Sequence, residues 1–120
     1  MSKAIVAPTN SLLLVMDPAV GVPPTLTGNS GASATDSCVA VRTLMEYDGE
    51  TTVFLSNSKT PPLFCEKRLV AKIRTPNRML AICESTRQPV LTSAVNGLET
   101  MVEVWTNDAH EPDIVFVAFA

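Results

Sequence analysis

The sequence predicts an all-β protein: a single-domain antiparallel β-sandwich, or a partly closed barrel, of seven to nine short strands. Short apolar runs rich in β-branched residues recur along the chain, separated by Pro, Gly, Asn and Asp, a pattern typical of sheet proteins. A length of 120 residues fits one globular domain, residues 1–120. The composition is 46% hydrophobic and 18% charged, which suffices for a buried core without disulfides or metals and excludes intrinsic disorder.

Four strands are predicted in the first half of the chain. Residues 3–7 and 12–16 are short apolar runs separated by turn-forming residues. Residues 38–47 and 51–56 flank Asp48-Gly49, a dipeptide typical of two-residue hairpin turns. We therefore predict that these two strands form a hairpin.

The segment 17–36 is predicted to be a long mobile loop, because it is poor in charge and rich in Pro, Gly, Ser, Thr and Ala. Its stretch 28–33 resembles a phosphate-binding loop in composition, but it lacks the Lys that supplies charge to phosphates. We interpret it as a surface loop. The functional alternative is a loop that becomes ordered on a partner.

Four more strands are predicted in the second half. In 68–74, apolar residues alternate with basic residues, the period-two pattern of a half-buried strand. The run 79–83 follows a Thr-Pro-Asn turn. In 99–105, Thr100, Val102 and Val104 alternate with Glu99, Glu103 and Trp105, which predicts another strand. The run 114–119 is continuously apolar, like a strand covered on both faces.

Two segments have a helical alternative, and the last strand has two possible environments. Apolar residues in 91–98 recur at helical spacing after Pro89, and those in 38–45 share one helical face, so an α+β fold with one or two short helices is the alternative. The run 114–119 must be covered, because an exposed apolar strand aggregates. It is either central in a sheet or the contact of a homodimer.

Charge is segregated along the chain, although the net charge is only −3. Residues 59–87 contain seven basic and two acidic residues, a net charge of +5, and the remainder carries −8. The net negative charge and the scarcity of aromatic residues argue against nucleic-acid binding.

The basic segment has two interpretations. We expect Arg68, Lys72 and Arg74 to share one side of a strand, and Glu99 and Glu103 to share one side of another. The first interpretation pairs them as a cross-strand charge ladder. The second leaves a basic face that binds a protein with an acidic surface.

The residues predicted to bind a partner in the second interpretation are Arg68, Lys72, Arg74, Arg78 and Trp105. Trp105 is an interface anchor if it shares the charged face with Met101, because Trp and Met are enriched at interfaces. It is a core residue if the strand register is shifted by one.

His110 is the single histidine, so nucleophilic catalysis through a histidine base would depend on it. Asp108, Glu111 and Asp113 flank it, and these carboxylates with the imidazole form a candidate metal or general-base site. The spacing matches neither an EF-hand loop nor a zinc motif. The other interpretation is a solvated acidic hairpin loop.

We expect a cytoplasmic protein without a cofactor or a membrane segment. No apolar run approaches the roughly 20 residues of a membrane span. The three cysteines, Cys38, Cys65 and Cys83, are an odd number at wide spacings and predict no disulfide framework. We interpret all three as structural residues.

The layout of short strands without a catalytic set of residues, with a basic strand before a Thr-Pro turn, resembles the small bacterial immunity and nuclease-inhibitor proteins. The resemblance implies a non-enzymatic protein that binds another protein as an inhibitor or immunity factor. The alternatives are a small metal-binding or hydrolytic module centred on His110, and a structural subunit that oligomerises through strand 114–119.

Overall fold

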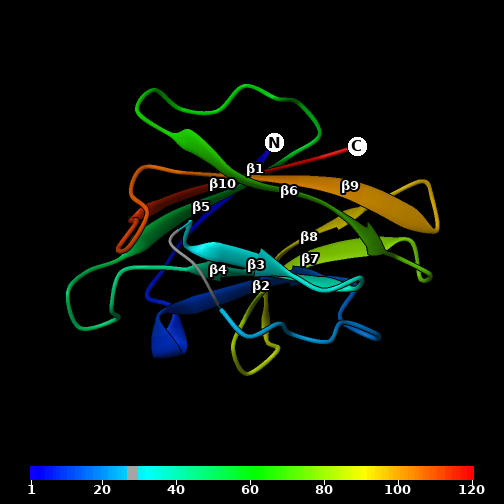
Figure 1. The fold of residues 1–120 in the computed structure, drawn as a ribbon, viewed down its shortest axis with the longest axis horizontal. Coiled ribbons are helices and arrows are strands. Elements are labelled where there is room, and N and C mark those ends of the chain that lie inside the picture. The colour runs from blue at the N-terminus through cyan, green and yellow to red at the C-terminus, as the bar shows by residue number, and fades with distance from the viewer. Residues whose placement is uncertain (27–29) are drawn as a thin grey trace.

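The structure, a computed structural model, describes residues 1–26 and 30–120 and confirms the all-β sandwich (Figure 1). In that part of the chain ten strands form two five-stranded sheets. They are β1 (Ser2–Val6), β2 (Leu12–Met16), β3 (Ala32–Ala34), β4 (Cys38–Arg42), β5 (Thr51–Ser56), β6 (Glu66–Arg74), β7 (Met79–Glu84), β8 (Pro89–Ala94), β9 (Glu99–Thr106) and β10 (Ile114–Phe119). The upper sheet of Figure 1 has the order β1–β5–β10–β9–β6, and the lower sheet has the order β3–β4–β2–β7–β8.

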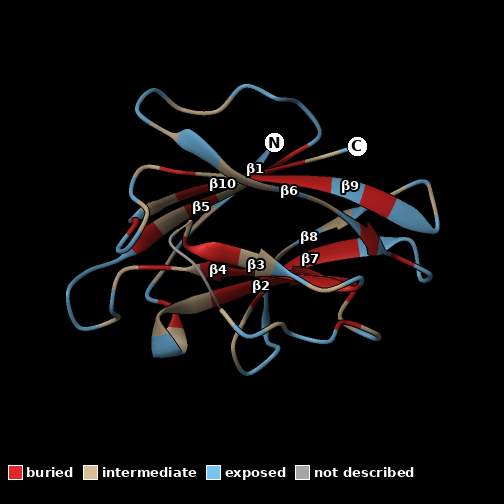
Figure 2. Ribbon diagram, in the orientation of Figure 1, coloured by how far each residue is buried: buried red, intermediate tan, exposed pale blue. Residues whose placement is uncertain are grey.

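The core lies between the two sheets and follows from the alternation of side chains along each strand. Residues two apart point to the same face, so a strand contributes every second residue to the interior. In Figure 2 the buried residues are concentrated on the strands of both sheets. The core residues are all aliphatic and at most 2% exposed: Leu13, Val15, Val39, Val41, Val53, Leu55, Ile73, Leu80, Ile82, Val102, Val104, Val115 and Val117. Burial of each such side chain stabilises the fold by roughly 1.5–3 kcal/mol.

The predicted hairpin around Asp48-Gly49 is wrong. β4 pairs with β2 and β3 in the lower sheet, whereas β5 pairs with β1 and β10 in the upper sheet. The segment 43–50 therefore carries the chain from one sheet to the other. A turn dipeptide predicts that the chain reverses, but both edges of β4 are already paired, so β5 finds its partners in the opposite sheet.

Two strands lie where no strand was predicted, which raises the count above nine. β3 lies inside the predicted loop 17–36, and β8 lies where a helix was the alternative. Leu91 of β8 pairs with Ile82 of β7 and packs against the core, which a strand achieves as well as a helix. The helical alternative is wrong: within the described residues the chain has one 3₁₀ turn, Thr9–Ser11, and no α-helix. No helix in this part of the chain is long and apolar enough to cross a membrane.

β10 is the central strand of the upper sheet and has a partner on each edge. It is antiparallel to β9 and parallel to β5, in a sandwich that we predicted to be antiparallel. The interpretation of 114–119 as a central strand is therefore correct. Because both edges are paired, a homodimer or larger assembly formed by pairing of this strand with another copy is excluded in this fold.

The segment 17–26 covers the outer face of the lower sheet. Six outward-facing residues there form a second apolar cluster and are at most 1% exposed: Leu14, Met16, Cys38, Ala40, Ala81 and Cys83. Leu26 packs against this cluster. Gly21 lies so close to Met16 that a Cβ at this position would be 2.3 Å from the Met16 sulfur, which excludes any side chain without rearrangement.

Hydrogen bonds fix the start of this segment to the lower sheet. Asp17 is 1% exposed, and its carboxylate accepts the backbone N–H of Asn77 at 2.9 Å. The Arg87 guanidinium donates to the carbonyls of Pro18 (3.1 Å) and Gly21 (2.8 Å). The beginning of the predicted mobile loop is thus packed and hydrogen-bonded. Residues 27–29, which include part of the stretch 28–33, lie outside the described residues.

Candidate protein-binding surface

The connection between β5 and β6, residues 57–65, crosses the outer face of the upper sheet, and we call it the crossover. β5 is parallel to β10, and β6 has the same direction because β9 is antiparallel to both β10 and β6. The chain must therefore return over β10 and β9 before β6 begins. Since the core fills the inner face, the crossover passes over the outside, where it forms the green arch of Figure 1.

The crossover is fixed to the sheet by a buried carboxylate. Glu103 points outward from β9 but is only 5% exposed, and it forms ion pairs with Lys59 of the crossover and, at 3.7 Å, with Lys67 of β6. The hydrogen bond from Lys59 holds the pKa of Glu103 below its usual range, although burial opposes this shift. Glu103 therefore stays ionised and keeps both lysines on this face of the sheet.

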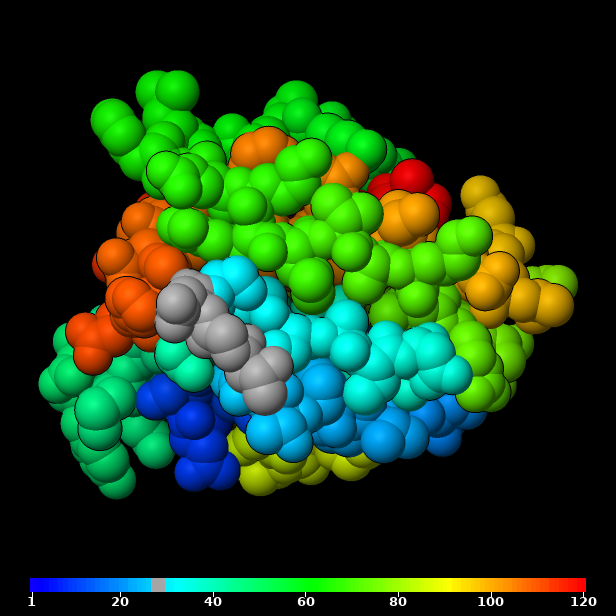
Figure 3. All heavy atoms as spheres, in the orientation of Figure 1, coloured from blue at the N-terminus to red at the C-terminus, as the bar shows by residue number. Residues whose placement is uncertain are grey.

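Two adjacent apolar side chains of the crossover point into solvent. Leu63 is 83% exposed and Phe64 is 90% exposed. They follow Pro61-Pro62, and the N–H of Cys65 donates to the Pro62 carbonyl at 3.3 Å, which closes a turn. Phe64 has φ = 70°, a left-handed conformation that costs a bulky residue stability. The segment that leads into β6 stands out from the surface at the upper left of Figure 3.

The outer face of β6 continues this surface with basic side chains. Val70, Lys72 and Arg74 are exposed, and Val70 retains 48% of its accessible area. Lys72 lies opposite Met101 of β9, whereas Arg74 lies opposite Glu99. Basic residues thus surround an exposed apolar residue on one strand face.

The predicted charge ladder does not form between the predicted partners. Glu103 is opposite Val70 and binds other lysines, and the Arg74 guanidinium lies 4.0 Å from the Asp36 carboxylate. In residues 1–26 and 30–120, no ion pair joins Lys72 or Arg74 to either glutamate of β9. Lys72 has no ion-pair partner in that part of the chain, so its charge is available to a partner.

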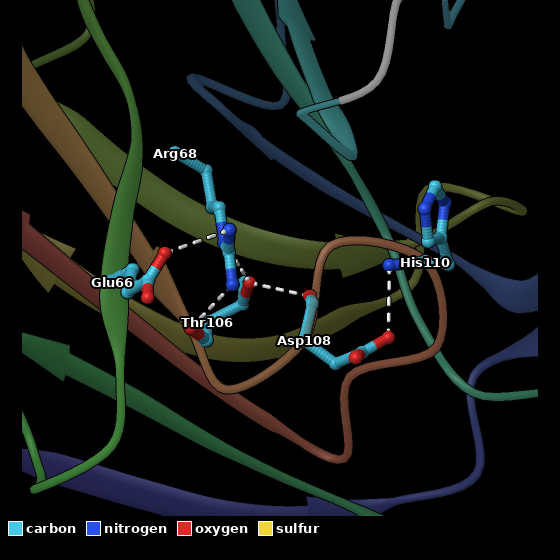
Figure 4. A network of polar contacts seen from close by, with 5 residues as sticks. All are labelled: Glu66, Arg68, Thr106, Asp108 and His110. Carbon is cyan, nitrogen blue, oxygen red and sulfur yellow. Dashed lines mark hydrogen bonds and ion pairs between the residues drawn. The ribbon is translucent and has the colours of Figure 1, made fainter.

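A β-bulge removes Arg68 from the exposed basic row. The register shifts between Lys67 and Leu69, so Arg68 is the extra residue. Its Nε donates to Thr106 Oγ1 at 2.9 Å and its Nη2 to the Thr106 carbonyl at 3.3 Å, while Nη1 lies 3.4 Å from the Glu66 carboxylate (Figure 4). The Arg68 side chain is only 15% exposed. It holds the end of β9, and the expectation that it shares one row with the other basic residues of the strand is wrong.

The acidic loop around His110 connects β9 to β10 and adjoins the Arg68 network. Asp108 Oδ2 accepts the backbone N–H of His110 at 3.0 Å, and its carbonyl accepts the Thr106 hydroxyl at 2.8 Å (Figure 4). The same Oδ2 also accepts the backbone N–H of Glu111 at 2.8 Å. The two N–H donors hold the pKa of Asp108 below its usual range. Its carboxylate is therefore occupied in shaping the loop.

The remaining members of the predicted metal site do not converge. Asp113 Oδ1 accepts the side-chain amide of Asn107 at 2.6 Å, and His110 and Glu111 are exposed. The described residues contain no group of three or more His, Cys, Asp or Glu side chains arranged to hold a metal ion. The metal-binding alternative stays a prediction without geometric support.

Trp105 lies on the outer face of β9, as one of its two interpretations predicted. Lys67 is opposite it in the register, and the Lys67 ammonium lies 5.6 Å from the ring centroid, within cation–π range. The Trp105 ring is half-buried, and its Nε1 is buried without a hydrogen-bond partner among the described residues. Neighbouring Met101 is 38% exposed.

Three of the five predicted partner-binding residues share the outer face of the upper sheet: Lys72, Arg74 and Trp105. Arg68 does not, and Arg78 lies in the turn before β7, where its N–H donates to the Thr75 carbonyl at 2.9 Å. Leu63, Phe64 and Lys67 were not predicted. Leu-Phe directly after Pro-Pro, in a segment without strand periodicity, is the signal that would have identified the apolar pair.

The free cysteines do not contribute a reactive group to this surface. Cys38 and Cys83 are buried in the outer cluster of the lower sheet, and burial raises the pKa of Cys38 to about 12. Burial also raises the pKa of Cys65, against the opposing effect of Arg68. All three thiols are therefore protonated at neutral pH, as expected of structural cysteines.

No protein-family model and no curated protein matches the chain. Among solved structures, the chain is similar to ComJ from Bacillus subtilis, described as the inhibitor of the DNA degrading activity of NucA. The TM-score is 0.61 and the identity is 11%, over 99% of this chain and 94% of ComJ. At that identity the likeness shows a shared fold.

Proposed function

We propose that the protein is a non-enzymatic cytoplasmic inhibitor that binds a protein partner with an acidic surface. The surface that binds is formed by Leu63, Phe64, Lys67, Val70 and Lys72, and we call it the crossover surface. One observation carries the proposal: two adjacent apolar side chains, 83% and 90% exposed, stand beside a basic strand face whose Lys72 has no ion-pair partner in the described chain.

The chemistry of the crossover surface fits protein recognition. Exposed aromatic and apolar residues supply most of the affinity when they enter a pocket on the partner, whereas surrounding charges steer the encounter. The rigid Pro61-Pro62 pair and the closed turn over residues 62–65, which contains Phe64, limit the conformational entropy that binding would otherwise cost. Phe64 is thus a pre-positioned anchor, and Lys67 and Lys72 attract an acidic partner.

The likeness to ComJ supports an inhibitor of a DNA-degrading enzyme as the specific form of this function. ComJ is described as an inhibitor of such an activity, and its fold extends over almost the whole of this chain. A nuclease is a suitable target for a basic surface if the contact lies on its acidic residues. The absence of a catalytic set of residues in the sequence agrees with a binding role.

The test is an inhibition assay against purified DNA-degrading enzymes of the source organism. The wild-type protein should form a stoichiometric complex with one of them and slow DNA cleavage. Phe64→Asp should weaken that complex by about 30-fold or more, the effect of removing an interface hot spot. Tyr47→Asp is the matched control, because Tyr47 is also an aromatic residue, 88% exposed, but lies between β4 and β5.

Two results would contradict the proposal. One is that no nuclease of the organism is bound or inhibited at micromolar concentrations of the protein. The other is that Phe64→Asp inhibits as well as Tyr47→Asp does. Light scattering on the wild type and on Phe64→Asp tests the predicted homodimer. A wild-type dimer that Phe64→Asp converts to a monomer would mean that the crossover surface binds a second copy of the chain and not a different protein.

A further inference from the structure

The outer edge of β6 carries unpaired backbone groups in the middle of a long strand. β6 is the edge strand of the upper sheet, next to β9 alone. The N–H of Arg74 donates to the Asp36 carbonyl at 2.9 Å and so points away from β9. Because N–H and C=O directions alternate along an antiparallel strand, those of Val70 and Lys72 also point away from β9.

The hydrogen bonds between β9 and the β10 side of the sheet show independently that the backbone groups of Lys72 point away from β9. Met101 is opposite Lys72, and the Met101 N–H and C=O both bond to Ala120, on the β10 side of β9, at 2.9 and 3.0 Å. Lys72 and Met101 are therefore a non-hydrogen-bonded pair. The N–H and C=O groups of Val70 and Lys72 have no hydrogen-bond partner in the described residues.

The surroundings of this edge select the kind of strand that fits it. On the outward side, Lys67, Lys72 and Arg74 place positive charge along the strand. On the inward side, Leu69 and Ala71 are only partly buried against the core. An added strand would therefore place acidic side chains outward and small apolar side chains inward, in alternation. At the bulge, a shallow depression of about 340 Å³ lined by Lys67, Arg68, Leu69 and Val70 leaves room for one of these side chains.

A second copy of the chain does not fit this edge. Two β6 edges side by side would oppose Lys67, Lys72 and Arg74 of each copy, and such charges on an edge strand prevent sheet-to-sheet association. The same charges favour an acidic segment of a different protein.

We propose that the free edge of β6 accepts an extended segment of the partner in which acidic and apolar residues alternate, and that this segment adds a strand to the upper sheet. This inference rests on the proposed function for the identity of the partner, but the recognition chemistry belongs to the edge itself. Phe64, at the N-terminal end of β6, then anchors the partner beside the added strand.

The probe is a seven-residue peptide of alternating Glu and Val, with the alternating Lys and Val peptide as control. Amide hydrogen exchange is followed residue by residue by NMR. The Glu–Val peptide should slow exchange of the Val70 and Lys72 amides about tenfold or more at saturation, and the Lys–Val peptide should leave both unchanged. Lys72→Glu should weaken binding of the Glu–Val peptide about tenfold, whereas Lys3→Glu, on β1 at the opposite edge of the sheet, should leave it unchanged.

Proline at the edge tests the backbone contact. Val70→Pro removes one outward N–H without removing a bond to β9, and proline is tolerated in an edge strand at such a position. The variant should lose peptide binding. If it does not fold, the exchange measurement on the wild-type protein still decides.

Several results would overturn the inference: no binding of the Glu–Val peptide at millimolar concentration, binding that protects other amides, or protection of Val70 and Lys72 by self-association without peptide. Binding of the Lys–Val peptide equally well would also overturn it. The proposed function fails separately, when no nuclease is inhibited although the peptide adds to β6. Conversely, an inhibited nuclease with no protection at Val70 and Lys72 would reject the added strand and leave the proposed function standing.

Discussion

The two sheets are each covered on the outside by a connection, and the two covers differ in where they place apolar side chains. The segment 17–26 packs Leu26 against the cluster around Met16 and is fixed by hydrogen bonds of Asp17 and Arg87. The crossover, 57–65, covers the upper sheet but leaves its apolar pair almost fully exposed.

The difference follows from the side chains on the outer face of the sheet beneath each connection. The outer face of the lower sheet is made of aliphatic residues, methionine and cysteines, which need an apolar cover. The outer face of the upper sheet already contains the packed rings of Phe54 and Phe116, 6.0 Å apart, and the buried Glu103 that binds Lys59 of the crossover. The crossover is therefore held by an ion pair, and its apolar residues remain free. Apolar residues of a covering loop are structural only when the sheet below has room for them.

The largest effect on stability is expected from Met16→Ala. Met16 is fully buried beneath Gly21, so its truncation leaves a cavity and should lower the free energy of unfolding by roughly 2–5 kcal/mol. Met101→Ala, on the outer face of the upper sheet and 38% exposed, is the matched control and should cost less than about 1 kcal/mol. Urea denaturation measures both. Equal losses of unfolding free energy in the two variants would contradict the inference that only the lower sheet needs an apolar cover on its outer face.

Asp17→Ala should have the next largest effect. The substitution removes the buried acceptor of the Asn77 N–H, and with it a hydrogen bond that fixes the start of the 17–26 segment. The free energy of unfolding should fall by roughly 1–3 kcal/mol. Asp36→Ala removes an exposed carboxylate 4.0 Å from Arg74 and should change stability by less than about 1 kcal/mol. Thermal unfolding of both variants tests this order. A larger loss of stability for Asp36→Ala than for Asp17→Ala would contradict the inference that the Asp17 hydrogen bonds fix the 17–26 segment.

The crossover should respond to pH through Glu103. Its pKa in the folded protein is lowered, so the stabilisation is fully present above the ordinary pKa of 4.5 and is lost as pH falls through the folded value. The wild-type protein should therefore lose more unfolding free energy than Glu103→Gln as the pH is lowered from neutrality through this range. Denaturation at a series of pH values measures the difference. Glu99→Gln is the matched control, because Glu99 is exposed on the same strand and forms no ion pair in the described residues; this variant should lose as much unfolding free energy as the wild type.

The smallest effect on stability is expected from the double substitution Leu63→Asp and Phe64→Asp. Neither side chain packs against the sheet, so the free energy of unfolding should change by no more than about 0.5 kcal/mol. The same variant should lose partner binding. A loss of more than about 2 kcal/mol, on the scale of a core substitution, would mean that Leu63 and Phe64 pack against the upper sheet, as Leu26 packs against the lower sheet.

The periodicity of the sequence was sufficient to predict the sandwich and most strand positions. Leu12–Met16, Thr51–Ser56 and Ile114–Phe119 occupy the predicted bounds, because apolar runs closed by turn residues report burial directly. Pairing partners were not predictable: Asp48-Gly49 marks a turn, but the choice between two sheets depends on edges that are occupied elsewhere in the chain.

The site was predictable only in part for a related reason. The basic character of 68–74 is visible in the sequence, but the bulge that turns Arg68 toward Thr106 is not, because one extra residue leaves the local alternation nearly intact. The exposure of Leu63 and Phe64 depends on what fills the sheet below them. Local sequence carries no information about that space.

The central position of β10 also constrains how the chain folds. Residues 52–56 of β5 pair with residues 114–118, so the upper sheet is divided into β1–β5 and β9–β6 until β10 is present. Such distant pairings make folding slow, because a long loop must close before the contacts stabilise it. A nascent chain on the ribosome would hold the lower-sheet strands and both halves of the upper sheet without a closed core. Folding of this protein should therefore be completed only after residues 114–119 have left the exit tunnel, and from their emergence until they pair with β5 and β9 this apolar strand is the segment most prone to aggregation.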